Sequence, residues 1–138
     1  MAEMKGGCLC GAVRFTAANV ETDFETCHCG MCRRWAGSPV FAAAAEGVEF
    51  AGEDTLRVYD SSEWASRGFC GKCGSNLFYY LKPADKYIMC VGTFDDASPF
   101  RLVGEIYIDH KPPGYNFAGD LPKQTEAEFL AKFSLPEA

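Results

Sequence analysis

Eight cysteines give this sequence its most distinctive chemistry, because a thiolate sulfur is both a nucleophile and a metal ligand. Seven of them fall into three short clusters with the spacings CxC, CxCxxC and CxxC, and the eighth stands alone. In chain order the clusters are Cys8 and Cys10, then Cys27, Cys29 and Cys32, then Cys70 and Cys73, and the single residue is Cys90.

A disulfide framework is one interpretation of an even cysteine count in a chain of 138 residues. The residues that follow Met1 lack the charged and then apolar pattern of a secretory signal, so a cytoplasmic, reducing location is expected. Cysteines two or three residues apart are also too close in sequence to link distant segments. The spacings therefore favour metal binding.

The first and last clusters can form a closed site. In an extended strand, residues two apart project from the same face, so Cys8 and Cys10 can offer both sulfurs to one ion. A CxxC sequence flanked by glycine is typical of zinc ribbons, in which the turn brings backbone amides close to sulfur. Cys70 and Cys73 would then complete a structural Zn²⁺ site with four thiolates.

The middle cluster predicts a second, open zinc site, and so two Zn²⁺ per chain. Cys27, Cys29 and Cys32 supply three thiolates, and three protein ligands with one vacant position are the arrangement of catalytic zinc. An open position on such an ion can bind and deprotonate a thiol, which could then attack an aldehyde. Spacing alone leaves the pairing of the seven ligands open.

Two residues near these ligands have alternative interpretations. In an extended segment His28 points away from Cys27 and Cys29, so a role as proton shuttle, or a supporting or surface role, is favoured over metal ligation. Cys90 lies in an apolar run typical of a buried strand and is interpreted as a core residue, with closure of the second site as the alternative.

Substrate contacts are expected directly after the middle cluster. The guanidinium of Arg33 is suited to bidentate binding of a carboxylate, and Trp35 could form the wall of a pocket. The alternatives are a solvated surface arginine and a core aromatic residue.

These residues must be positioned by a mainly β fold. Alternating apolar residues bounded by Gly and Pro predict strands over residues 11–17, 55–59, 76–81, 87–94 and 102–109. Thr125 and Glu128 have the spacing of a capping box and predict a short C-terminal helix, and a further helical turn is expected after Cys32.

Composition limits the function classes. A chain with 48% hydrophobic residues and a net charge of −6 is a folded domain that repels phosphate backbones, so no nucleic acid is expected as a partner. No apolar run approaches the roughly 20 residues needed to cross a bilayer, so no membrane association is expected either. We expect a zinc-binding domain over residues 4–122 and a helix and tail over residues 123–138 that pack on it. The oligomeric state is left open.

Three segments resemble the glutathione-dependent formaldehyde-activating enzyme family, which also includes centromere protein V. They are GCLCGAVRF at residues 7–15, CHCGMCRRWAG at 27–37 and RGFCGKCGS at 67–75, and the resemblance extends from Gly6 to about Pro122. It implies a single β-tent domain of short antiparallel strands. It also implies a structural zinc on Cys8, Cys10, Cys70 and Cys73 and a catalytic zinc on Cys27, Cys29 and Cys32.

The activity that this resemblance implies is that of a carbon–sulfur lyase, the reversible joining of glutathione to formaldehyde. Family members often carry a His where Glu105 stands and a Trp after the Lys-Pro-Pro-like stretch, where this chain has Gly114 and Tyr115. The identities of the thiol and of the carbonyl partner therefore remain open. The alternatives to an enzyme are a non-catalytic zinc module that binds a protein and a thiol sensor that releases zinc on oxidation.

Overall fold

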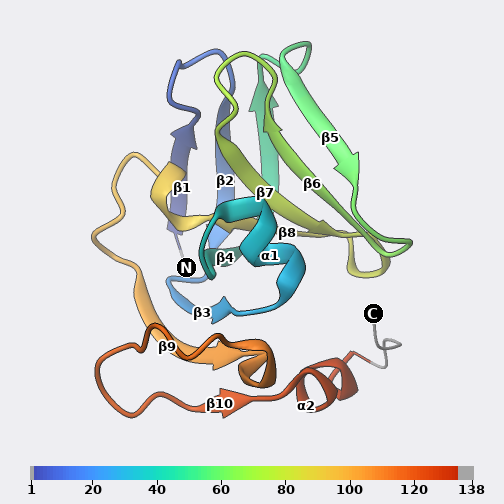
Figure 1. The fold of residues 1–138 in the computed structure, drawn as a ribbon. Coiled ribbons are helices and arrows are strands. Elements are labelled where there is room, and N and C mark those ends of the chain that lie inside the picture. Colours follow the sequence, from blue (N-terminus) through green and yellow to red (C-terminus); the bar gives the residue numbers. More distant parts are fainter. Residues whose placement is uncertain (1, 134–138) are drawn as a thin grey trace. The chain divides into compact units, whose positions relative to one another are not determined.

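The computed structural model describes residues 2–133, and within them ten strands outnumber two short α-helices (Figure 1). The mainly β class with a short C-terminal helix is confirmed. The chain forms two compact units, one of Met1–Asp23 and Ala42–Arg101 and the other of Phe24–Phe41 and Leu102–Ala138. Neither helix of the described part has the length and hydrophobicity required to cross a bilayer.

The first unit contains an antiparallel sheet whose strands lie in the order β1, β2, β4, β8, β7, β6, β5. The strand β4 begins in the second unit and continues in the first. The bounds are β1 Ala2–Gly7, β2 Arg14–Val20, β4 Val40–Ala51, β5 Leu56–Asp60, β6 Ala65–Cys70, β7 Asn76–Leu81 and β8 Lys86–Cys90.

The core of the first unit is apolar and aromatic. Phe15 on β2 meets Phe94 edge-to-face, with ring centroids 5.2 Å apart, a geometry that aromatic quadrupoles favour. Leu77 on β7 and Met89 on β8 are fully buried. Cys8 and Cys70 belong to the same buried cluster, so two of the expected metal ligands are part of this core.

The second unit carries the remaining elements. They are β3 Asp23–Cys27, α1 Gly30–Ala36, β9 Arg101–Ile106, β10 Lys123–Gln124 and α2 Glu126–Ala131. The first residues of β3 and β9, Asp23 and Arg101, belong to the first unit. Strand β10 runs parallel to β9, with Lys123 opposite Glu105. In Figure 1 these two strands lie side by side, and α2 follows β10. The capping box is present, because Thr125 accepts from the Glu128 amide and the Glu128 carboxylate accepts from the Thr125 amide.

Three predicted strand bounds are wrong for local reasons. β2 begins at Arg14 because the preceding residues form a turn. β8 ends at Cys90, where a 3-10 helix, Val91–Thr93, takes over. β9 ends at Ile106 because Tyr107 has a φ of 57°, which no strand accommodates. The predicted tail beyond residue 133 lies outside the described residues, and the proposed domain division stays a prediction.

Gly52, in the turn after β4, provides a test of this architecture. It has a φ of +83°, and a Cβ there would lie 1.9 Å from the Ala12 carbonyl oxygen. Gly52→Ala should therefore lower the free energy of unfolding by at least the about 1–3 kcal/mol of a strained backbone position, measured by urea unfolding with metal held constant. Gly92→Ala is the matched control, because a Cβ there has no neighbour within 4 Å. Equal loss in both variants would contradict this account.

Candidate metal centres

The first group of sulfurs lies in the first unit. The Sγ atoms of Cys8, Cys10, Cys70 and Cys73 all lie within 4.8 Å of one another. The Sγ of Cys10 is 3.6 Å from that of Cys8 and 3.8 Å from that of Cys70. None of the eight cysteines forms a disulfide, so the disulfide interpretation is wrong. The structure thus brings together the four residues that were predicted to form the closed site, and the group could hold a metal ion.

The expected reason for the Cys8–Cys10 pairing was wrong. These residues lie in a tight turn after β1 and not in an extended strand. The Cys8 amide donates to the Val13 carbonyl oxygen at 3.0 Å, and the Val13 amide donates to the Cys8 sulfur at 3.3 Å. Gly11, with a φ of +81°, supplies the backbone conformation that closes this turn.

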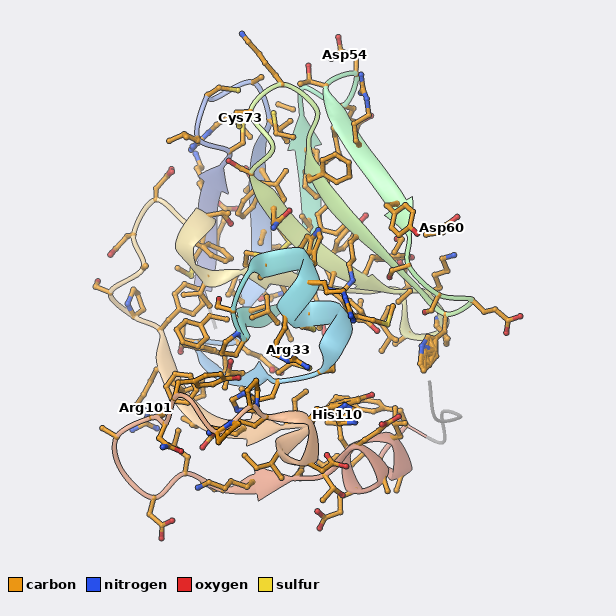
Figure 2. The ribbon with its side chains drawn as sticks, viewed as in Figure 1. Arg33, Asp54, Asp60, Cys73, Arg101 and His110 are labelled. Atoms are coloured by element: carbon orange, nitrogen blue, oxygen red, sulfur yellow. The ribbon has the colours of Figure 1, made fainter. Side chains whose placement is uncertain are left out.

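A similar turn joins β6 to β7 and presents the other two sulfurs. The amides of Lys72 and Cys73 donate to the Cys70 sulfur at 3.3 and 3.4 Å, as the zinc-ribbon comparison led us to expect. Figure 2 labels Cys73 in this turn. Hydrogen bonding from Ser75 lowers the pKa of the Cys73 thiol to about 5, a shift that favours the thiolate form. A preformed thiolate is a ready metal ligand.

The second group lies in the second unit. The Sγ atoms of Cys27, Cys29 and Cys32 lie within 4.8 Å of one another, and among residues 2–133 no other His, Cys, Asp or Glu belongs to the group. Cys27 ends β3, Cys29 is the N-cap of α1, and Cys32 lies in the first turn of that helix. The Cys29 sulfur accepts the Cys32 amide at 3.3 Å, which is an ordinary N-cap hydrogen bond made with sulfur.

Crowding raises the pKa of Cys27. Hydrogen bonding with Cys29 and Cys32 is the largest cause, and burial acts in the same direction. Three thiolates without a cation would repel one another in a buried place, and binding of a metal ion by thiols releases their protons. The geometry of the group could hold a metal ion.

His28 is fully buried beside these ligands, so a surface role for it is wrong. Its Nε2 lies 2.8 Å from Oε1 of Glu105, and its Nδ1 lies 2.7 Å from the Tyr115 hydroxyl. A carboxylate can only accept, which assigns the proton to Nε2 and leaves Nδ1 to accept from Tyr115 in the neutral ring. Both ring nitrogens are thus engaged, and His28 is not available as a fourth ligand, in line with the expectation from sequence.

Two cationic side chains lie close to Tyr115. The Lys111 ammonium lies over the Tyr115 ring, 4.7 Å from the ring centroid. Burial raises the pKa of the Tyr115 hydroxyl, and the charges of Glu105 and Cys27 raise it further. The positive charge of Arg33 acts in the opposite direction and lowers this pKa. Arg33 lies on α1 (Figure 2), and its Nε donates to the His28 carbonyl oxygen at 3.0 Å. Lys111 was not predicted from the sequence, where its only signal is its place before two prolines.

The other candidate residues are placed as follows. Trp35 is half-buried on α1, three residues after Cys32 and hence on the same side of the helix. Cys90 is half-buried at the end of β8 and belongs to neither sulfur group. The alternative that Cys90 closes the second site stays a prediction.

The comparisons with known proteins agree with these motifs. The model of the glutathione-dependent formaldehyde-activating enzyme family matches residues 3–110. A protein of Schizosaccharomyces pombe named as an uncharacterized lyase is 32% identical over 132 residues, which cover 94% of this chain and 96% of the relative. A protein of Halomonas elongata, provisionally named a glutathione-dependent formaldehyde-activating enzyme, is 30% identical over 87 residues, or 56% of this chain and 55% of its own length.

A solved structure supports the fold. The crystal structure of a Rhodobacter sphaeroides protein matches with a TM-score of 0.57 and 24% identity, and covers 87% of this chain and 99% of that one. Because the family model spans most of the chain and includes all three cysteine clusters, the predicted membership is confirmed: the chain belongs to the glutathione-dependent formaldehyde-activating enzyme family.

Proposed function

We propose that this chain is a zinc-dependent carbon–sulfur lyase that reversibly joins a glutathione-type thiol to a small aldehyde such as formaldehyde. The observation that carries the proposal is the gathering of the Cys27, Cys29 and Cys32 sulfurs within 4.8 Å of one another, without a fourth protein ligand from the described residues. The family to which the chain belongs and the names of its relatives support the reaction class.

The donor set of the first group fits zinc. Four thiolates around a tetrahedral ion with bonds of about 2.3 Å lie about 3.8 Å apart. The two sulfur–sulfur distances at Cys10, 3.6 and 3.8 Å, agree with this geometry. Cys8, Cys10, Cys70 and Cys73 would hold a structural zinc, and Cys27, Cys29 and Cys32 would hold the catalytic one.

The residues around the second group fit an anionic thiol substrate. Zinc held by Cys27, Cys29 and Cys32 would offer a further coordination position that lowers the pKa of a bound thiol. Arg33 and Lys111 would bind and orient the substrate's carboxylates. The sulfur–carbon bond forms as the carbonyl π bond breaks, and the thiol's proton ends on the new hydroxyl oxygen, so the reaction needs no oxidant or reductant.

Two of the predicted roles are kept as proposals. Trp35 would pack against the substrate beside Cys32, with which it shares a helix. His28 would serve as a proton shuttle by way of the Tyr115 hydroxyl, because its other ring nitrogen faces Glu105.

A pair of serine variants tests the division between the two centres. Cys32→Ser should lose one zinc per chain and the catalysed formation of S-hydroxymethylglutathione, measured by exchange NMR with labelled formaldehyde, while it keeps its unfolding temperature. Cys73→Ser should lose the structural ion and several kcal/mol of stability, which for a chain of this size lowers Tm by on the order of 10 °C or more. Similar unfolding of both variants would refute the assignment of separate roles.

Charge removal beside Tyr115 tests the substrate class. Arg33→Ala and Lys111→Ala should each raise KM for glutathione about tenfold, the effect of one lost charge-assisted hydrogen bond of about 1.4 kcal/mol, and kcat should change little in Lys111→Ala. Arg34→Ala, on the exposed neighbouring residue, is the control.

The same variants should bind an uncharged thiol such as 2-mercaptoethanol as the wild type does. If KM rises equally for both thiols, Arg33 acts through its hydrogen bond to the His28 carbonyl oxygen and not through a substrate carboxylate.

A further inference from the structure

His28, which lies between Cys27 and Cys29, is held in place by more hydrogen bonds than metal binding by these two cysteines requires. His28 is 0% exposed, and hydrogen bonds at 2.8 and 2.7 Å tie its ring nitrogens to Glu105 and Tyr115. Neither contact is needed for a sulfur to bind a metal ion. A buried imidazole with both nitrogens engaged has one orientation, and this fixes the χ1 and χ2 angles of the residue.

The backbone of His28 is fixed as well. Its amide donates to the Ile106 carbonyl oxygen at 3.1 Å, and its carbonyl oxygen accepts from Arg33 Nε at 3.0 Å. The two peptide groups that join His28 to Cys27 and Cys29 are therefore each held by one hydrogen bond. Because these peptide groups set the directions of the neighbouring Cα–Cβ bonds, they set where the two sulfurs point.

Glu105 is itself anchored at both ends. Its side chain is 5% exposed, and its Oε2 lies 3.6 Å from Lys123 Nζ while its Oε1 faces His28. Its amide donates at 2.9 Å to the carbonyl oxygen of Pro122, the residue before β10, so its backbone is held as well. Burial of a carboxylate costs desolvation free energy, which its hydrogen-bond and ion-pair partners offset. We therefore expect Glu105 to act mainly by fixing the geometry of its partners.

We infer that Glu105 and Tyr115 are positioning residues of the three-cysteine centre, and that they act on it through His28. Their hydrogen bonds hold the ring, the ring holds the backbone between Cys27 and Cys29, and the backbone holds the sulfurs in the arrangement that binds the ion. This inference rests on the proposed function only in requiring that the centre bind a metal. Partners of this kind are worth about 10–100-fold in metal affinity.

The test uses Co²⁺ in place of zinc on the full chain. The second equivalent of Co²⁺ gives a difference spectrum whose d–d bands report the geometry of the three-cysteine centre. Glu105→Leu should shift these bands and weaken the second ion by about 10–100-fold in competition with a chelator. Glu105→Gln keeps an oxygen that can accept from His28 Nε2 and should restore both properties most of the way toward wild type.

The chain offers a matched control. His110 and Glu126 form a second His–Glu pair in the same unit, with the same 2.8 Å distance, and neither residue adjoins a cysteine of either group. Glu126→Leu should leave the affinity and spectrum of the second ion unchanged, even where it lowers the free energy of unfolding. An equal loss of metal affinity in this variant would show a general effect of stability and would overturn the positioning role.

Tyr115→Phe decides the question if Glu105→Leu fails to fold, since it removes one hydroxyl from a half-buried side chain. It should shift the d–d bands and weaken the second ion, and wild-type values would overturn the inference. A wild-type chain that binds a single ion refutes the proposed function itself. A wild-type chain that binds two ions, of which the second ignores Glu105 and Tyr115, refutes only the positioning role.

Discussion

The gathering of sulfurs is the constraint on which the other features of this chain depend. Thiolates packed within 4.8 Å of one another repel, and in a buried place the solvent cannot screen that repulsion. The pKa of the Cys27 thiol is raised for this reason, because a protonated sulfur avoids the repulsion when no cation is present. A divalent cation bound between the sulfurs would offset this repulsion, so the same argument favours metal binding in each unit.

The two groups meet this constraint with different backbones. In the first unit, tight turns aim amide N–H groups at sulfur, as Val13 does for Cys8 and Lys72 for Cys70. In the second unit the end of a strand and the cap of a helix position the sulfurs, and the Cys29 sulfur accepts a hydrogen bond from the Cys32 amide. These donors lower the energy of the thiolate form before any ion arrives, so part of the binding geometry is built into the fold.

The parts that sequence predicted are those encoded by local spacing. The cysteine clusters, the strand Asn76–Leu81 and the capping box at Thr125 each depend on residues a few positions apart. The strands β4 and β6 were missed because VFAAAAEGVEFA and ASRGFC lack a clear alternation of apolar and polar residues. The prediction that the Cys8 and Cys10 sulfurs lie close together was right, but the predicted extended strand was wrong. A turn and a strand can both bring the sulfurs of residues i and i+2 together.

The contact between His28 and Glu105 could not be predicted in this way, because it joins residues 77 positions apart through a strand and a loop. The one sequence signal was a charged residue in an otherwise apolar run, LVGEI, where a strand has no reason to bury a carboxylate without a partner. Such a carboxylate adds negative charge to a unit that already gathers three thiols. The Nε2–H group of His28 and the ammonium of Lys123 offset that charge, and two cationic side chains, Arg33 and Lys111, lie near Tyr115. Cations are thus concentrated where the sulfurs are, in a chain whose net charge is −6, and an anionic thiol could approach this region although the surface as a whole repels it.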